Sequence, residues 1–490
     1  MDRSYPPPRP SNRWLAALVT LGLVLPLTAC SVNPATGRSQ LMLISEAQEI
    51  QMGREADPQI VAQFGLYPDQ KIQDYVSALG HDLAAESERP DLEWHFKVLD
   101  DPLVNAFALP GGYVYITRGI MSHLESESEL AGVLGHEIGH VVARHSANQL
   151  SKQQLATAGL IVGAVLLDPE DRYLAGLAGV GMQLAFLKFS RDDERQADDL
   201  GLRYLDRAGF DPRPMPEVFN TLGRVAAASG GSGMPNWLAT HPAPENRVGR
   251  LEAQIADLEG PFDGRPVGRE PYLREINGLT FGDDPRQGFF KGNVFYHPDL
   301  ALQIEFPEGW KTQNTRSAVM ALSPDEDAMM VFTLADQESL EAAENAFFEA
   351  DTVVRGERFA PAIRGFSSIG RSFEASGQMK VKGKVAFIEG KNRIFQLLTY
   401  GTDARWSRYD DRVVQAIGSF EELTDRRFLG VQSAKLRIVK IDRAMPLEEF
   451  QRRYPSSVDL TTLAIINEVE EGATLPAGTL VKRVVGGEIP

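Results

Sequence analysis

Two histidines and a glutamate stand at a spacing suited to metal-dependent hydrolysis, in the segment His136-Glu137-Ile138-Gly139-His140. Residues four apart share one face of a helix, so both imidazoles can reach one metal ion. Glu137, beside the first histidine, can then take a proton from a water held by that metal. The alternative is a chance match inside an ordinary buried helix, because the motif is short.

A catalytic zinc usually keeps three protein ligands and one open position, so a third ligand must come from another segment. Glu194 is the candidate, because it lies on a second predicted helix with Asp198 one turn later on the same face. Asp198 can accept the outer N–H of a ligand histidine and fix its tautomer. Taken alone, such an acidic pair is more often a solvated edge. Farther along, His241 or Arg247 could donate to a tetrahedral oxyanion.

The helix that carries the motif is predicted to begin near Glu127, because Ser126-x-x-Glu129 is a capping box before an apolar periodic run. We expect it to end near His145. That histidine falls off the metal-facing stripe, and we interpret it as a helix-end cation rather than a ligand.

Three further segments frame the motif. Ser190 is the predicted cap of the Glu194 helix and Gly209 lies beyond its end, and a later helix is expected over Pro244 to Leu258. In the segment Asn105 to Thr117, Tyr113 to Thr117 is rich in strand formers, and the preceding Pro-Gly-Gly turn favours an edge strand. The apolar stretch Leu155 to Leu187 is predicted as a buried helical pair, or else as a membrane- or partner-facing flap.

The composition predicts a multidomain globular protein. The chain has 490 residues, 43% of them hydrophobic and 24% charged, so two to four domains are expected. Its net charge of −17 and the lack of a basic stripe argue against nucleic-acid binding. Cys30 is the only cysteine, which excludes a disulfide within the chain.

The first thirty residues contain a basic start, an apolar run from Trp14 to Leu27, and small residues before Cys30. The segment resembles a bacterial lipoprotein signal peptide over residues 1–29, which implies cleavage before Cys30 and lipidation of its sulfur. An uncleaved anchor or a free thiol is the alternative. Ser31 follows where an Asp would suggest inner-membrane retention, so we expect a lipid anchor on the periplasmic side of the outer membrane.

The motifs together resemble a known family. H-E-x-x-H followed by S-R-x-x-E-x-x-A-D at Ser190–Asp198 is similar to the gluzincin zinc metallopeptidases related to HtpX and the CAAX prenyl proteases. The tether Asn33–Gly37, the segment Asn105 to Thr117 and Thr240-His241-Pro242 resemble the periplasmic BepA-like subfamily. The resemblance covers roughly residues 31 to 260.

Carried over residue by residue, the resemblance implies one Zn²⁺ per chain on His136, His140 and Glu194, with Glu137 as the catalytic base. It also implies that His241 lies near the metal. There His241 either stabilises the transition state or caps the zinc in a latent form, and the sequence leaves both roles open.

The resemblance further implies polypeptide substrates. An edge strand around Asn105 to Leu109, beginning at Asn105 and Ala106, would pair with the substrate backbone by strand addition.

The expected fold is a mainly α zincin protease domain with a small edge-stranded sheet, followed by an α+β domain and a small β-α-α-β domain. The predicted boundaries are tether 30–44, metallopeptidase 45–260, linker 261–290, α+β domain 291–424 and final domain 430–490. The α+β domain resembles PsbP-like domains through Phe306-Pro-x-Gly-Trp310, and the last resembles a LysM module through Asn467 and Leu475-Pro-Ala-Gly478. Because Arg443-Ala444-Met445 replaces the Gly-Asp-Thr turn of such modules, a structural or docking role is at least as well supported as peptidoglycan binding.

Two classes of function follow. The first is an envelope zinc endopeptidase that removes misfolded or misassembled periplasmic and outer-membrane proteins. The second is a chaperone or assembly scaffold for outer-membrane proteins, with a latent metal site and contact with the assembly machinery. The second rests on the non-catalytic C-terminal sequence and on the apolar stretch Leu155 to Leu187. A glycan-binding protein is a poorer third option.

Overall fold

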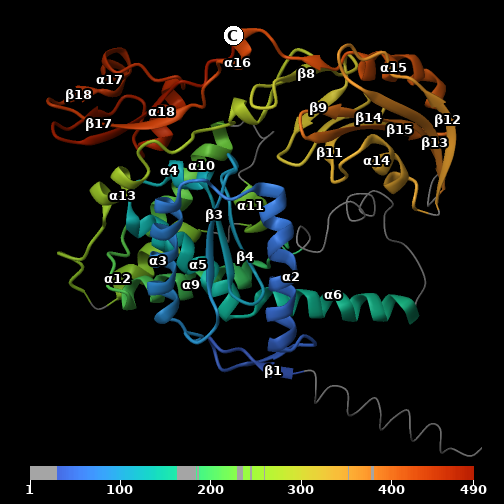
Figure 1. Cartoon of the computed structure of the whole chain (residues 1–490). Coiled ribbons are helices and arrows are strands. Elements are labelled where there is room, and N and C mark those ends of the chain that lie inside the picture. The colour runs from blue at the N-terminus through green and yellow to red at the C-terminus, as the bar shows by residue number, and fades with distance from the viewer. Residues whose placement is uncertain are drawn as a thin grey trace, which may run out of the picture. The chain divides into compact units, whose positions relative to one another are not determined.

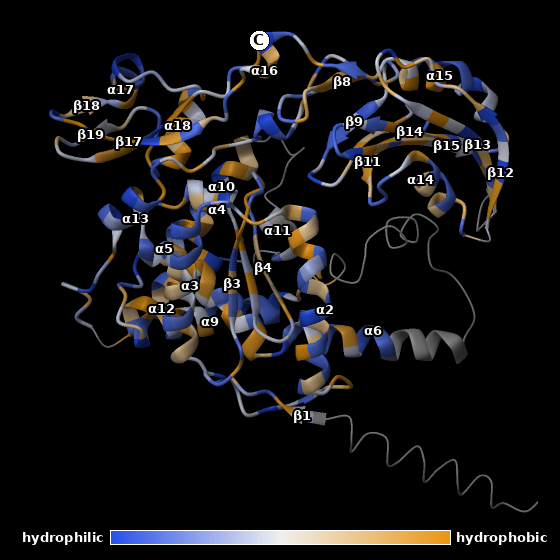
Figure 2. Ribbon diagram, in the orientation of Figure 1, coloured by the Kyte–Doolittle hydropathy of each residue, from blue (hydrophilic) through white to orange (hydrophobic). Residues whose placement is uncertain are grey.

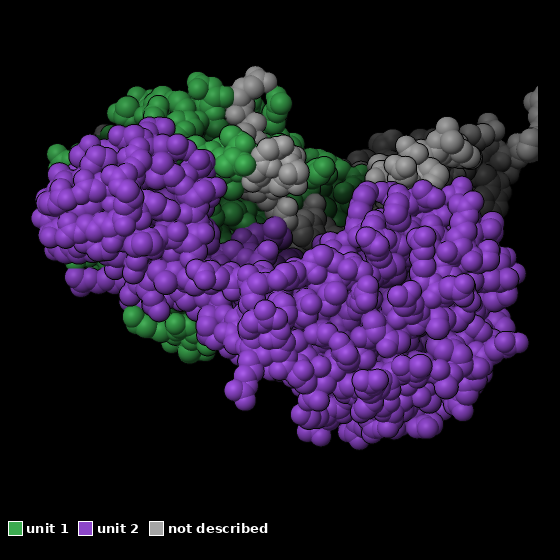
Figure 3. All heavy atoms as spheres, turned by 90° about the horizontal axis from the view of Figure 1, so that it is seen from above, with its two compact units in different colours: residues 1–60, 67–99, 104–272 green, residues 61–66, 100–103, 273–490 purple. Residues whose placement is uncertain are grey.

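The computed structural model describes residues 30–162, 184, 187–228, 236–242, 246–258, 260–350, 352–376 and 380–490. The described residues form two compact units. Those of the first lie within 1–60, 67–99 and 104–272, and those of the second within 61–66, 100–103 and 273–490 (Figure 3). In this part of the chain, no helix combines the length and the apolar character that a membrane crossing requires.

The first unit packs helices around a small sheet (Figure 1). Its strands are β1 (Cys30–Val32), β2 (Ser39–Leu41), β3 (His95–Leu99), β4 (Ala106–Leu109) and β5 (Tyr113–Thr117). Its helices are α2 (Glu46–Phe64), α3 (Gln70–Ala85), α4 (Arg118–His123), α5 (Glu127–Val142), α6 (His145–Val162), α9 (Arg191–Arg207), α10 (Met215–Ala228), α11 (Asn236–Thr240), α12 (Arg247–Asp257) and α13 (Arg269–Glu275).

The three-stranded sheet has the order β3-β5-β4, with β3 parallel and β4 antiparallel to β5. The predicted edge strand is therefore β4, coloured as hydrophobic in Figure 2, and its four residues are buried. Tyr113–Thr117, which the Pro-Gly cue placed at an edge, is instead the central strand β5. Gly111 and Gly112 adopt φ of +84° and +96° in the turn before it, a conformation that glycine permits.

Helix α5 is the most deeply buried helix of this unit. It begins at Glu127 as predicted, and Ser126 Oγ accepts the Glu129 N–H at 3.2 Å. It ends at Val142, three residues before the predicted end, and every residue from Ser128 to Val142 is buried. An all-round buried helix needs partners on each side, and α3, α9 and α10 all pack against it.

Helix α9 lies so close to α5 that glycines line the contact. A Cβ on Gly201 would stand 2.9 Å from the backbone nitrogen of His136, and one on Gly139 would stand 3.0 Å from the carbonyl oxygen of Ala197. This close approach brings Glu194 and Asp198 of α9 next to His136 of the motif. The α9 start is as predicted, with a Ser190–Asp193 capping box, and Gly209 follows its end at φ +80°.

Three other predictions meet different outcomes. Helix α12 begins at Arg247 within the predicted range, and residues 243–245 are outside the described part. The first helix of the apolar stretch Leu155 to Leu187 is the end of α6, but most of that stretch lies outside the described residues. The segment 261–290 is more than a linker, because it holds α13, whose Tyr272 is fully buried and donates to the Met121 carbonyl at 2.6 Å.

The second unit is rich in antiparallel strands. One sheet has the order β12-β13-β14-β15-β11-β10-β9, and another has the order β16-β8-β7-β6. The strands are β6 (Phe289–Lys291), β7 (Val294–His297), β8 (Leu302–Glu305), β9 (Lys311–Asn314), β10 (Val319–Leu322), β11 (Ala328–Ala335), β12 (Val353–Phe359), β13 (Ser368–Ser376), β14 (Lys380–Gly390), β15 (Arg393–Thr402) and β16 (Glu421–Glu422). The helical elements among them are η1 (Pro285–Gln287), α14 (Leu340–Phe347), η2 (Trp406–Arg408), α15 (Asp410–Gly418) and α16 (Arg426–Leu429).

The chain ends in the predicted strand-helix-helix-strand order. The elements are β17 (Lys435–Lys440), β18 (Met445–Pro446), α17 (Leu447–Arg453), α18 (Leu460–Ile466), β19 (Thr474–Leu475) and β20 (Leu480–Val485). β17 and β20 pair antiparallel, and β18 and β19 form a second short pair.

Candidate metal centre

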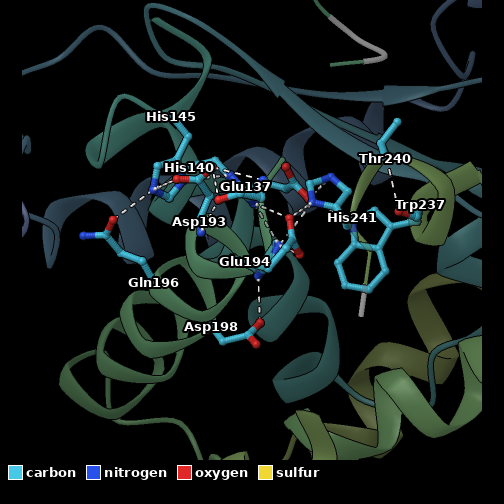
Figure 4. A network of polar contacts seen from close by, with 12 residues as sticks. Glu137, His140, His145, Asp193, Glu194, Gln196, Asp198, Trp237, Thr240 and His241 are labelled. Atoms are coloured by element: carbon cyan, nitrogen blue, oxygen red, sulfur yellow. Dashed lines mark hydrogen bonds and ion pairs between the residues drawn. The ribbon is translucent and has the colours of Figure 1, made fainter. Parts of the chain in front are cut away.

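Four side chains from three segments converge in the interior of the first unit. His136 and His140 come from α5, Glu194 from α9, and His241 directly follows α11. Figure 4 labels His140, Glu194 and His241 of this group. Their ligand atoms all lie within 4.8 Å of one another. The four side chains are between 0% and 2% exposed, so the group is enclosed by protein.

The nearest atoms of this group leave little space between them. His140 Nε2 lies 3.1 Å from His136 Nε2, and His241 Nδ1 lies 3.4 Å from the same atom. His241 Nδ1 is also 2.9 Å from Glu194 Oε1, while Glu194 Oε2 has no hydrogen-bond partner among the described residues. The ring nitrogens and the carboxylate therefore point at one common place.

A second layer of hydrogen bonds fixes which ring nitrogens face that place. The Nδ1 atom of His136 lies 3.0 Å from Asp198 Oδ1, as the predicted role of Asp198 requires. The Nδ1 atom of His140 lies 3.0 Å from His145 Nδ1, and His145 Nε2 lies 2.9 Å from Gln196 Oε1. If His145 donates from Nε2 to the Gln196 oxygen, its Nδ1 accepts from His140, whose Nε2 lone pair then faces the group.

The interpretation of His145 as a helix-end cation is wrong. The residue begins α6, is 3% exposed, and has a pKa lowered by burial, which the charges around it do not offset. It is a neutral partner of His140. The chain bends between Val142 and His145, and helical periodicity across that bend could not place it.

Arg247 lies behind the ligands. Its Nη2 atom is 2.5 Å from Asp198 Oδ1 and 3.3 Å from Glu194 Oε2, and its guanidinium lies 3.9 Å from the centre of the Phe219 ring. Arg250 also donates to Asp198, at 2.6 Å. The structure thus places Arg247 on the two carboxylates, and an oxyanion-binding role for it remains a prediction.

Glu137 is fully buried beside the four side chains. The indole N–H of Trp237 donates to Glu137 Oε1 at 3.0 Å, and Glu137 Oε2 has no hydrogen-bond partner among the described residues. Trp237 also stacks on His241, with ring centres 5.2 Å apart. The sequence interpretation missed Trp237; its place four residues before His241 on a short helix is the only signal that could have found it.

The charges of the group show what kind of ligand it suits. Burial lowers the pKa of His140 well below its ordinary value. Burial also acts to raise the pKa of Glu194, but the imidazoles of His241, His140 and His136 outweigh it and hold that pKa well below its usual range. Burial lowers the pKa of His241, yet the carboxylates of Glu194 and Glu137 outweigh it, so the net shift is upward. These shifts favour the ionised form of Glu194 and the neutral form of His140, the forms in which a carboxylate and an imidazole bind a metal ion.

These residues fit a zinc ion. Neutral imidazole nitrogens and an ionised carboxylate oxygen are zinc ligands. Glu194 Oε2 is a buried acceptor that receives no hydrogen bond from the described residues, although the Arg247 guanidinium lies 3.3 Å away. The outer nitrogens of both motif histidines are engaged by Asp198 and His145, as ligand histidines in metal sites usually are.

The residues predicted for substrate binding and lipidation lie at β4 and β1. Asn105 and Ala106 are buried at the start of β4, and the Asn105 Oδ1 atom has no hydrogen-bond partner among the described residues. Cys30 lies in β1, paired with Leu41. Lipidation of Cys30 and substrate binding at β4 stay predictions.

The same region matches known proteins. A family model described as Peptidase family M48 matches residues 70–255. The mitochondrial metalloendopeptidase OMA1 of Schizosaccharomyces pombe is 30% identical over 263 residues, which cover 52% of this chain and 75% of that protein. The chain belongs to peptidase family M48. Zinc is the cofactor of this family, in agreement with the donor set described above.

A second set of relatives shares less of its length. The beta-barrel assembly-enhancing protease of Escherichia coli K12 is 33% identical over 244 residues, covering 48% of this chain and 50% of that protein. The chain thus spans about half the length of this relative. Among solved structures, cyanobacterial PsbP from Synechocystis aligns with 27% of this chain and 94% of its own length, at 9% identity and a TM-score of 0.23.

Proposed function

We propose that this chain is a zinc-dependent metalloendopeptidase that hydrolyses peptide bonds of misfolded or misassembled proteins. One observation carries the proposal. His136, His140 and Glu194 converge from two helices, and the carboxylate of Glu137 lies beside them with one oxygen that has no hydrogen-bond partner among the described residues. This arrangement of donor atoms, carboxylate and outer hydrogen bonds in one buried place supports a catalytic metal site.

Bound zinc supplies a Lewis acid that polarises a carbonyl and lowers the pKa of water. His136, His140 and Glu194 would hold it, and Asp198 and His145 would keep the two imidazoles in the tautomers that bind a metal. Glu137 takes a proton from the attacking water on its free oxygen and later passes it to the leaving amine. Trp237 orients the other oxygen of Glu137.

The location of the enzyme and its substrates are part of the same proposal. We infer a lipoprotein anchored through Cys30 on the periplasmic side of the outer membrane, with outer-membrane and periplasmic polypeptides as substrates. The lipobox-like sequence before Cys30 and the relatives named as beta-barrel assembly-enhancing proteases support this. A strand of the substrate would pair along β4, the edge strand that begins at Ala106.

Digestion of an unfolded protein by the zinc-loaded full-length chain tests the proposal. We expect casein or a urea-unfolded porin to be cut at internal bonds, identified by mass spectrometry, and Glu137→Gln to abolish the cutting while retaining zinc. Glu127→Gln is the matched control, because Glu127 lies on the same helix but accepts from the Tyr75 hydroxyl at 2.9 Å. Cleavage by Glu137→Gln at the rate of the control would remove Glu137 from the mechanism.

A scaffold or chaperone with a latent metal site is the second candidate. It is favoured by the burial of the whole group and by His241 and Trp237, which stand against Glu194 and Glu137 where a substrate carbonyl and water would have to enter. Full rescue of a deletion strain's envelope defects by Glu137→Gln would favour this candidate over the peptidase.

We also propose specific folds for the C-terminal regions. The seven-stranded antiparallel sheet with α14 packed on β14 supports a PsbP-like domain. The antiparallel β17–β20 pair flanking α17 and α18 supports a LysM-like module. In that module Asn467 donates to the Lys482 carbonyl at 3.0 Å and accepts its N–H at 2.7 Å, which ties α18 to β20.

A further inference from the structure

The chain reverses between the motif helix α5 and helix α6 through a residue with unusual backbone geometry. Arg144 has a φ of +59°, in the left-handed region that non-glycine residues rarely adopt. Its N–H donates to the Val141 carbonyl at 3.1 Å, and its carbonyl accepts from Asn148 at 3.0 Å. The turn therefore ends one helix and starts the next without glycine.

The side chain of Arg144 shows why an arginine stands there. It is 7% exposed, and its Nε atom donates to Glu49 Oε2 at 2.7 Å. Nη1 donates to Ser31 Oγ at 3.2 Å, and Nη2 donates to the Ile44 carbonyl at 2.9 Å. All three nitrogens of the guanidinium are thus held, and these bonds favour the turn over the extended or helical alternatives.

Glu49 depends on these cations for its charge. It lies on α2, is 2% exposed, and stands 3.9 Å from Arg89 in addition to Arg144. Burial raises the pKa of Glu49 above its ordinary value, although both guanidiniums lower it. Arg89 itself donates to the Val141 carbonyl at 3.1 Å, so the same cluster also caps α5.

The N-terminal segment of residues 30–44 is built into the same turn. The side-chain amides of Asn33 and Gln40 both donate to the Ala143 carbonyl, each at 3.3 Å. The Leu43 N–H donates to Ser151 Oγ on α6 at 2.9 Å. The segment of residues 30–44, which would begin at a lipidated Cys30, is therefore bonded to the C-cap of α5 and to α6.

The residue after Arg144 is His145, the neutral partner of the His140 imidazole. Because backbone torsions at residue 144 set the direction in which residue 145 leaves the turn, a change there moves the His145 ring. His145 fits between His140 Nδ1 and Gln196 Oε1 with contacts of 3.0 and 2.9 Å, so it has little room for displacement.

We propose that Arg144 is a positioning residue for the metal centre, which Glu49 and the N-terminal segment 30–44 hold in a left-handed turn that directs His145 onto His140. The segment expected to carry the lipid then also stabilises the zinc site. The inference rests on the proposed function, because the orientation of His140 matters through the zinc that it binds.

Arg144→Gly in the full-length protein separates side-chain anchoring from backbone conformation, since glycine adopts the same φ without strain. We expect the zinc dissociation constant, measured by chelator competition, to rise about 10-fold or more. The visible absorption spectrum of the cobalt-substituted protein should change, because the ligand field at His140 changes. Arg144→Lys, which retains the charge but cannot hold three partners, should lie between the glycine variant and the wild type.

A double variant tests the contacts that the N-terminal segment makes with the same turn. Asn33→Ala combined with Gln40→Ala removes both donors to the Ala143 carbonyl, and should weaken zinc binding several-fold. Tyr204→Phe is the matched control. It deletes a buried hydroxyl that donates to Glu88 at 2.7 Å, on the same helix as Glu194 but ten residues away, and should leave zinc affinity unchanged.

The proposal would be overturned if Arg144→Gly had the zinc affinity and cobalt spectrum of the wild type and only a lowered melting temperature. Arg144 would then be a structural helix cap. If Arg144→Gly does not fold, Glu49→Gln and the Asn33/Gln40 double variant must weaken zinc binding, and unchanged affinity in both overturns it equally. A wild-type chain that binds zinc but cuts no peptide would refute the proposed peptidase while leaving this zinc-affinity test intact.

Discussion

Replacement of Asp198 by asparagine should damage both the fold and the zinc site, because this carboxylate serves both. It is fully buried and accepts from His136, from Arg247 at 2.5 Å and from Arg250 at 2.6 Å. Asp198→Asn keeps the size of the side chain but removes its charge. Two guanidiniums and an imidazole then face a neutral amide.

The magnitude follows from these contacts. Leaving one partner of a buried ion pair uncompensated costs about 3–5 kcal/mol. Arg250 is 23% exposed and also pairs with Asp199, so it can turn to water and to that partner. We therefore expect Asp198→Asn to lower the unfolding free energy of the metal-free chain by about 3 kcal/mol. Loss of the carboxylate behind His136 should weaken zinc binding by about 10- to 100-fold, or roughly 1.4–2.8 kcal/mol.

The pH of the assay matters for this comparison. Burial acts to raise the pKa of Asp198, but Arg247 and His136 outweigh it and the pKa is lowered. A carboxylate with a lowered pKa stabilises the fold above its unfolded value of about 3.9, and this stabilisation is lost as pH falls through the folded value. Urea unfolding at pH 7 therefore measures the full contribution.

Asp199→Asn is the control for the same helix. Asp199 is 45% exposed and pairs with Arg250, so its loss should cost less than about 1 kcal/mol and leave zinc binding unchanged. The role assigned to Asp198 would be refuted if Asp198→Asn had an unfolding free energy within about 1 kcal/mol of the wild-type value and a zinc dissociation constant within about two-fold of it.

Two other variants probe separate parts of the chain. Gly201→Ala should lower the unfolding free energy by about 1–3 kcal/mol in urea and weaken zinc binding, because its Cβ would stand 2.9 Å from His136 N. The control is Gly223→Ala on α10, whose Cβ meets nothing within 4 Å and which should be neutral or stabilising. Equal effects of the two substitutions would contradict the close α5–α9 contact. In the second unit, burial lowers the pKa of His297 to about 4, and its Nδ1 accepts the Leu300 N–H. Because the unfolded histidine protonates first, stability should fall as pH drops from 6.5 toward 4, and His297→Gln should lose about 2 kcal/mol less than wild type between pH 7 and pH 5. Parallel pH profiles of the two proteins would show that His297 does not titrate in this way.

The sequence predicted those parts of the site that local rules govern. The capping residues Ser126 and Ser190 located both helix starts, and four-residue spacing placed His136 with His140 and Glu194 with Asp198. The close contact between the two helices could not be predicted in this way. It depends on glycines at positions 135, 139 and 201, which no local sequence pattern links to one another.

The misplaced features share the same cause. Val142, Ala143 and Arg144 end α5 through a turn stabilised by residues about a hundred positions earlier in the chain, so periodicity extended the helix to His145. The Pro-Gly-Gly cue located a turn correctly but could not tell which of the two strands it joins lies at the edge. In the second unit, strands β8, β11, β14 and β15 followed their alternating patterns, whereas exposed strands such as β9 and β12 lack an apolar face to reveal them.

Cleavage measured against added zinc tests the central claim most directly. The full-length chain is freed of metal with a chelator and given zinc up to two equivalents, with an unfolded protein as substrate. We expect activity to rise linearly and level off at one zinc per chain, and Glu137→Gln to bind the same single zinc yet cleave roughly 100-fold or more slowly. Cleavage by the metal-free chain, or full activity of the zinc-loaded Glu137→Gln variant, would contradict the account.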